Sequence, residues 1–181
     1  MHNTHKIILA GFGGQGMLLC GQVLGYAAMR DGFHVTWFPT YGAEMRGGAA
    51  ACSVVISSKP VGSPVVPKAD LVAVMSQPAF DKYHRSVADN GILLYNSDIV
   101  TVKEKRDNVR YIGVGFSRLA ADLGNPVVAN MIVLGSLNEL LQCVSVPALF
   151  LSVENKFGEK KAALLELNRK AIEMGIGAVC A

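Results

Sequence analysis

The sequence predicts an α/β fold of three layers, in which a mainly parallel sheet carries helices on both faces. Two observations predict this fold. Short apolar segments of strand type alternate with longer segments whose apolar residues recur at helical spacing. The first such pair, 6–10 and 15–29, is joined by a run of glycines. Because strands that alternate with helices usually pair in parallel, we expect a Rossmann-like βαβ unit at the start of the chain.

The remaining elements follow from composition and from turn residues. Strands are predicted at 6–10, 34–38, 50–57, 71–75, 92–95 and 110–114, and helices at 15–29, 79–88, 127–142 and 158–174. The segment 59–68 holds three of the seven prolines and is predicted to be a loop, since proline cannot donate to a strand ladder. Asp89-Asn90-Gly91 predicts a turn, and Gly175 is expected to end the last helix.

Composition predicts one domain, 1–181, and its low fraction of charged residues has two explanations. A chain of 181 residues is long enough to form a single core. Charged residues make up 17% of it, against about 25% in an average globular protein. Either apolar surface meets another chain, or the interior is a well-filled α/β core. The net charge of +3 is small and scattered, which argues against a nucleic-acid partner.

The chain is expected to be cytoplasmic. Its first residues lead directly into a strand, without the cationic and long apolar regions of a signal peptide. The longest apolar stretch, 131–141, is interrupted by polar residues and falls short of the ~20 residues that a membrane-spanning helix needs. No membrane span is therefore predicted.

The four cysteines are predicted to be buried small hydrophobes. Cys20, Cys52, Cys143 and Cys180 are far apart in sequence and stand among aliphatic residues. No Cys-x-x-Cys pair occurs, so the chain lacks the usual ligand spacing of an iron–sulfur cluster or a structural zinc site. No metal site is expected on this chain.

The glycine run at 11–16 is the first candidate contact site. Its members are Gly11, Gly13, Gly14, Gln15 and Gly16. Such a run lets the backbone turn tightly and lets a ligand approach the amides at the start of the next helix, where an anion is favoured. Alternatively, the glycines serve tight packing or the approach of another subunit's backbone. A nicotinamide dinucleotide is disfavoured, because strand 34–38 is not followed by the acidic residue that would bind a ribose.

The second candidate site is the loop that follows the strand at 34–38. Its residues of interest are Tyr41, Glu44, Arg46, Gly47 and Gly48. The planar guanidinium of Arg46 suits a carboxylate or a phosphate, and Glu44 could orient it or exchange a proton. A mutual Glu44–Arg46 pair at a subunit contact is the favoured interpretation, because no nucleophile with an adjacent base stands nearby. No catalytic residue is predicted.

Four segments of the chain form a pattern that is specific as a set. They are Gly-Phe-Gly-Gly-Gln-Gly at 11–16, Tyr-Gly-Ala-Glu-Met-Arg-Gly-Gly at 41–48, Ser-Val-Val-Ile-Ser at 53–57 and Asn-Met-Ile-Val-Leu-Gly at 130–135. In order and spacing they resemble the gamma subunit of 2-oxoacid:ferredoxin oxidoreductases. The resemblance covers nearly the whole chain. It is closest to the gamma subunit of 2-oxoglutarate:ferredoxin oxidoreductase.

The resemblance implies one subunit of a larger enzyme complex. That complex oxidatively decarboxylates a 2-oxoacid with thiamine diphosphate, passes electrons through iron–sulfur clusters to ferredoxin and forms an acyl-coenzyme A (acyl-CoA). The implied partners are alpha, beta and, where present, delta subunits. No Gly-Asp-Gly run for a magnesium–diphosphate site occurs, the nearest sequence being Arg30-Asp31-Gly32. Thiamine diphosphate, Mg and the iron–sulfur clusters are therefore expected on partner chains, and the isolated chain is expected to be inactive.

The resemblance also suggests where the two loops lie in the complex. The gamma subunit packs against the thiamine-binding chains, and we hypothesise that the glycine run and the loop with Glu44 and Arg46 face that junction. A contact of Arg46 with CoA is a separate hypothesis.

Two alternatives for the identity of the chain stay open: the small subunit of an indolepyruvate oxidoreductase, and a free-standing Rossmann-like nucleotide-binding protein. The residues do not identify the preferred 2-oxoacid.

Overall fold

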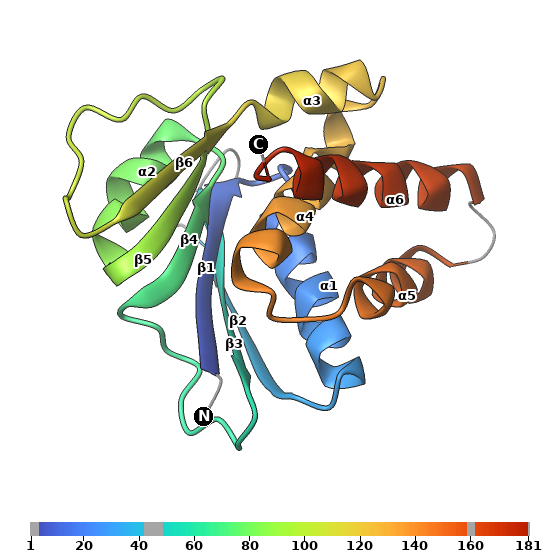
Figure 1. Cartoon of the computed structure of the whole chain (residues 1–181), viewed down its shortest axis with the longest axis horizontal. Coiled ribbons are helices and arrows are strands. Elements are labelled where there is room, and N and C mark those ends of the chain that lie inside the picture. The colour runs from blue at the N-terminus through green and yellow to red at the C-terminus, as the bar shows by residue number, and fades with distance from the viewer. Residues whose placement is uncertain (1–3, 42–48, 159–161, 181) are drawn as a thin grey trace.

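A six-stranded sheet forms the middle layer of the computed structural model, which describes residues 4–41, 49–158 and 162–180 (Figure 1). The strands are β1 (Thr4–Phe12), β2 (His34–Tyr41), β3 (Ala49–Ser57), β4 (Ala69–Val74), β5 (Val87–Asn96) and β6 (Arg110–Val114). The α-helices are α1 (Met17–Arg30), α2 (Gln77–Tyr83), α3 (Phe116–Asp122), α4 (Ala129–Leu141), α5 (Val146–Phe157) and α6 (Ala162–Gly177). Short 3-10 helices occupy His84–Ser86 and Pro126–Val128.

The sheet is mixed but mostly parallel. Its strand order is β2-β3-β1-β4-β5-β6, and β1 pairs in parallel with β4, β4 with β5, and β5 with β6. β3 pairs antiparallel with β1 on one side and with β2 on the other, so β1 and β2 run in the same direction. The predicted fold class is confirmed. The first βαβ unit differs from the simplest form because β3 is inserted between its two strands.

Helices cover the two faces of the sheet unequally. On one face α1, α3, α4, α5 and α6 enclose the larger core, whereas α2 packs on the other face over a smaller core (Figure 1). Successive side chains of β1 enter the two cores in turn, with Ile7 and Leu9 in the larger and Ile8 and Ala10 in the smaller. A strand covered on both faces has no polar side, which explains the continuous apolar run at 7–10.

The predicted helix at 79–88 is wrong in its second half. α2 ends at Tyr83, a short 3-10 helix follows, and β5 already begins at Val87. The expected turn at Asp89-Asn90-Gly91 lies inside β5, where the pairing with β4 shifts register. Asn90 has a φ of 62° at this irregularity. A bulge of this kind resembles a turn in the sequence, because both use short polar residues and glycine at left-handed positions.

Helix α5 was not predicted, although its start carries recognisable signals. The hydroxyl of Ser145 accepts the N–H of Ala148 at 3.3 Å, and a proline stands in the first turn. Ser145 is itself held by Asp31, whose carboxylate accepts its N–H at 2.6 Å and its hydroxyl at 2.8 Å. Asp31 directly follows α1. The start of α5 is thereby fixed to the end of α1.

Helices α4 and α6 cross at a contact that requires glycine on both sides. A Cβ atom on Gly135 of α4 would overlap the carbonyl oxygen of Ile172, and one on Gly175 of α6 would overlap that of Ile132. The hydroxyl of Ser136 donates a hydrogen bond of 2.8 Å to the carbonyl of Gly175. The prediction that Gly175 ends the last helix is therefore wrong. Glycine is present there because the two backbones touch.

Helix α4 is buried along most of its length, as its apolar circumference predicts. The apolar stretch at 131–141 lies within this helix, and α6 and α3 pack against it. Across the described ranges, every helix is too short or too polar to traverse a lipid bilayer.

We predict that Gly175→Ala destabilises the protein by about 1–3 kcal/mol, because the added methyl group forces two packed backbones apart. Gly177→Ala is the matched control, since it lies in the same helix and a Cβ atom there meets no atom within 4 Å. Urea unfolding monitored by circular dichroism measures both variants. Equal midpoints for the two would show that the crossing tolerates a methyl group.

Candidate binding edge at the glycine turn

The glycine run forms the connection between β1 and α1. Gly11 lies within the last residues of β1, Gly13 and Gly14 make the exposed turn, and Gly16 precedes the first residue of α1. Gly14 and Gly16 have φ angles of 96° and 75°, which side-chain-bearing residues rarely adopt. No side chain caps α1, and no acidic residue stands in its first turn. The start of α1 thus has the polarity that favours an anion or a partner's acceptor group.

The side chain of Gln15 ties the ends of two neighbouring strands together. Its Oε1 accepts the N–H of Phe12 at 2.7 Å, and its Nε2 donates to the carbonyl of Met75 at 3.0 Å. Phe12 ends β1, and Met75 directly follows β4. Gly11 makes room for this bridge, because a Cβ atom there would lie 2.5 Å from Oε1 of Gln15. Gln15 is therefore a structural bridge within the turn.

Asn130 at the start of α4 holds the turn from the other side. Its Nδ2 donates to the carbonyl of Gly16 at 3.3 Å. A Cβ atom on Gly16 would overlap this amide and lie 2.9 Å from its Cγ. Asn130 was not predicted as a site residue, although it opens the segment 130–135 that helped to carry the family resemblance. Its function is visible only once α4 is placed beside the turn.

A crevice of about 290 Å³ opens beside the turn, at the carboxyl ends of the parallel strands. Its lining residues are Gly14, Gln15, Met75, Ser117, Pro126, Val127 and Ala129. The helix that follows β1 lies on one face of the sheet and the helix that follows β4 lies on the other. Parallel α/β folds bind ligands at such a switch point. The described lining carries no charged side chain, so backbone groups, Gln15 and Ser117 supply its polar atoms.

The structure brings the start of the second candidate loop to this same edge. Gly11 of β1 and Tyr41 of β2 both pair with Ala50 of β3, one from each side. Two strand spacings separate them, or about 10 Å. Glu44, Arg46, Gly47 and Gly48 lie outside the described residues, and the predicted Glu44–Arg46 pair is therefore not tested.

Exposed apolar side chains surround the glycine turn. Tyr41 is 69% exposed, Val127 is 76% exposed and Phe12 is 38% exposed. Each stands at the carboxyl edge of the sheet or lines the crevice. Exposed apolar groups gathered at one edge are a common feature of surfaces that bind another molecule.

The cysteines behave as predicted at three positions and differ at the fourth. Cys20, Cys52 and Cys143 are buried, and burial raises the pKa of Cys52 and of Cys143 to about 12. Cys180 is exposed, so the expectation of burial is wrong there, because the chain has left the core by this point. In the described part of the chain, no three His, Cys, Asp or Glu side chains come together as metal ligands.

Residues 6–178 match the model of the pyruvate ferredoxin/flavodoxin oxidoreductase family. The chain belongs to this family. The matched range includes the glycine turn, the segment 41–48 and Asn130.

Individual relatives agree with the predicted resemblance to gamma subunits. The chain is 35% identical to the 2-oxoglutarate synthase subunit KorC of Methanothermobacter marburgensis, covering 94% of this chain and 97% of that one. It is 36% identical to the ketoisovalerate oxidoreductase subunit VorA of Methanothermobacter thermautotrophicus. This alignment covers 94% of this chain but only 35% of VorA. The chain thus spans about a third of the length of this relative.

A solved structure confirms the fold and the type of subunit that the chain resembles. The crystal structure of the keto/oxoacid ferredoxin oxidoreductase gamma subunit from Geobacter sulfurreducens superposes with a TM-score of 0.84 at 33% identity. The superposition covers 97% of this chain and 98% of that chain. The predicted resemblance to the gamma subunit of 2-oxoacid:ferredoxin oxidoreductases is confirmed.

We predict that Gly16→Ala destabilises the protein more than Gly14→Ala does. Both substitutions place alanine at a positive φ, at a cost of about 1–2 kcal/mol each. Only the methyl group at position 16 meets Asn130, which adds about 1–3 kcal/mol. Thermal unfolding of both variants measures the difference. The double variant Gly16→Ala with Asn130→Ala should be less destabilised than the sum of the two single variants. If the losses of unfolding free energy simply add, the contact between the methyl group and Asn130 is refuted.

Proposed function

We propose that this chain is the gamma-type subunit of a multisubunit 2-oxoacid:ferredoxin oxidoreductase. The observation that carries the proposal is the end-to-end match with proteins of the same kind and size. KorC and the gamma subunit from Geobacter sulfurreducens are covered over 97% and 98% of their lengths. Because KorC is named for 2-oxoglutarate, 2-oxoglutarate is the proposed substrate of the complex. VorA, which is named for ketoisovalerate, is equally similar, so a branched 2-oxoacid is the second substrate to assay.

Partner chains supply the remaining chemistry under this proposal. VorA is nearly three times as long as the part of it that this chain matches, so a complex containing this chain needs further subunits for the rest. Those subunits hold thiamine diphosphate with Mg and the iron–sulfur clusters, and they pass electrons to ferredoxin. The chain itself contributes binding surface and is inactive alone.

The glycine turn is the proposed junction with the thiamine-binding partner. Its crevice has a neutral lining, and Phe12, Tyr41 and Val127 are exposed around it. A neutral apolar edge suits a buried subunit contact better than a free surface. The uncapped start of α1 adds N–H groups that can pair with a partner's carbonyl or carboxylate.

A contact with CoA is a narrower proposal that depends on Arg46. The loop that contains Arg46 begins directly after Tyr41, at the edge where the crevice opens. Guanidinium groups bind phosphate oxygens in a bidentate manner, and the start of α1 favours an anion nearby. The 3′-phosphate or the diphosphate of CoA has the chemistry to occupy such a place.

Affinity capture of the chain from its native cells, under anaerobic conditions, tests the main proposal. We expect thiamine-binding and iron–sulfur-binding subunits to co-purify, and the eluate to reduce ferredoxin in the presence of 2-oxoglutarate and CoA. Mass spectrometry identifies the partners, and replacing 2-oxoglutarate by other 2-oxoacids ranks the substrates. Recovery of the chain alone, together with micromolar binding of nicotinamide or adenine nucleotides, would instead support a free-standing nucleotide-binding protein.

The CoA proposal predicts that Arg46→Ala raises the Michaelis constant for CoA by about tenfold or more, as expected for the loss of a charged hydrogen bond. The Michaelis constant for the 2-oxoacid should change little. Arg110→Ala is the matched control, because Arg110 is exposed at the first position of β6, at the opposite edge of the sheet. Normal assembly with an unchanged Michaelis constant for CoA would refute the contact.

A further inference from the structure

We infer that the chain has a second docking surface, a groove formed by α1, β2 and α5, and that it takes an acidic, amphipathic segment of a partner subunit. The inference rests on the proposed function and assigns a contact that the glycine turn does not provide. Its first support is the distribution of charge. Helix α1 has a single charged residue, Arg30, at its end, and β2 has none.

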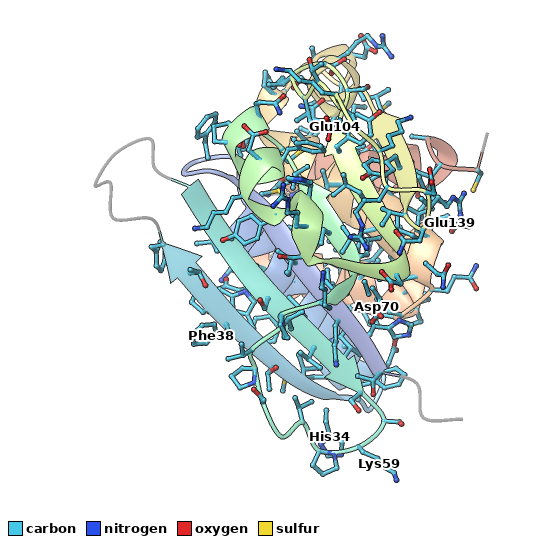
Figure 2. The ribbon with its side chains drawn as sticks, turned by 90° about the vertical axis from the view of Figure 1, so that its left-hand side faces the viewer. His34, Phe38, Lys59, Asp70, Glu104 and Glu139 are labelled. Carbon is cyan, nitrogen blue, oxygen red and sulfur yellow. The ribbon has the colours of Figure 1, made fainter. Side chains whose placement is uncertain are left out.

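Strand β2 is an edge strand, and the neighbouring helix α1 carries apolar groups outward. β2 pairs with β3 alone among the described strands. Tyr26 and Met29 of α1 are 54% and 61% exposed. Phe38 is exposed at the outer margin of the sheet (Figure 2), but it alternates with Trp37 and so lies on the face away from α1, outside the groove. Edge strands that stand free in solution usually carry charges, which this strand lacks. A helix and a strand of this composition are expected to be covered.

Two adjoining pockets make the surface concave. One, of about 460 Å³, lies between α1 and α5, and the other, of about 280 Å³, lies between α1 and β2. Tyr26 and Met29 line both of them. Trp37 and Val35 of β2 close the smaller pocket, so its floor is apolar. Together the two pockets form one groove divided by the side chains of Tyr26 and Met29.

The larger pocket contains a buried hydroxyl that has no hydrogen-bond partner among the described residues. Ser152 of α5 is 1% exposed, and its Oγ is unpaired. Ser152 is one of the residues that line this pocket, together with Met29 and Lys156. A buried polar group without a partner is unfavourable. A carbonyl or carboxylate oxygen placed in the pocket would accept its hydrogen bond.

The charged rim of the groove defines the chemistry of its occupant. Arg30 and Lys156 are the charged side chains that line the two pockets, and no described carboxylate lines either one. Lys156 donates to the side-chain oxygen of Gln22 at 3.0 Å, which leaves its charge uncompensated. A segment that carries a carboxylate beside large apolar side chains complements this arrangement of cationic rim and apolar floor.

The groove and the glycine turn lie at opposite ends of the same helix. Helix α1 has 14 residues and is therefore about 21 Å long. Gly16 stands at its start and Arg30 at its end. A partner that contacts both places covers the whole outer side of α1. About two thirds of VorA lies outside the part that this chain matches, and a subunit equivalent to that remainder is the proposed owner of the segment.

Charge reversal in the full complex tests the inference. The double variant Arg30→Glu with Lys156→Glu should bind the captured thiamine-binding partner at least tenfold more weakly than the wild type. Lys82→Glu with Arg110→Glu is the matched control, because both residues are exposed on other elements and the net change in charge is the same. Binding is measured by interferometry with each chain immobilised, after circular dichroism has shown equal unfolding temperatures. Met29→Glu, a single exposed substitution, provides a second variant with the same expected loss.

The outcomes separate this inference from the proposed function. If the wild-type chain captures no thiamine-binding subunit, the proposed function fails first. If the wild type captures the partner and the groove variants bind it as tightly as the control does, the docking groove is refuted. Self-association of the wild-type chain that is lost in the groove variants, with partner binding intact, would assign the groove to a second copy and also overturn the inference.

Discussion

The bridge made by Gln15 is the contact on which the arrangement of this protein depends most. One amide group joins the end of β1 to the residue after β4. The N–H of Met75 also donates to the carbonyl of Ala10 at 2.9 Å, so the bridge extends the pairing of the two strands beyond their last paired residues, where the helices that follow them leave toward opposite faces of the sheet. Asn130, at the start of α4, also holds the turn by donating a hydrogen bond to the carbonyl of Gly16. The turn is therefore fixed by side chains from within the subunit, which leaves its backbone and its crevice available to another molecule.

The unequal distribution of helices places the two proposed contact regions on one element. Because five described helices lie on one face, most of α1 is packed inside the larger core, and its outer side remains as a narrow apolar strip. The glycine turn stands at one end of this strip and the groove with Arg30 and Lys156 at the other. The apolar strip accounts for part of the low charge fraction of the chain.

Much of the fold could be predicted from the sequence, because buried strands and glycine turns have strong local patterns. The strands at 6–10 and 110–114 and the turn at 11–16 are examples. The role of Gly175 could not be predicted, since a glycine that admits a neighbouring backbone and one that ends a helix look alike until α4 is in place. Asn130 was missed as a contact for the same reason: its partner is 114 residues away. Helix α5 was missed because charged residues, which normally outline an amphipathic pattern, begin only at Glu154.

Hydrogen exchange by mass spectrometry, on the free chain and on the captured complex, tests the central claim that the glycine turn is a subunit junction. We expect amides at 13–17 to exchange at least tenfold more slowly in the complex, while those of α2 and β6 keep their rates. Unchanged exchange at the turn, with new protection on α2 or β6, would place the junction on another part of the molecule and refute the proposed junction at the turn.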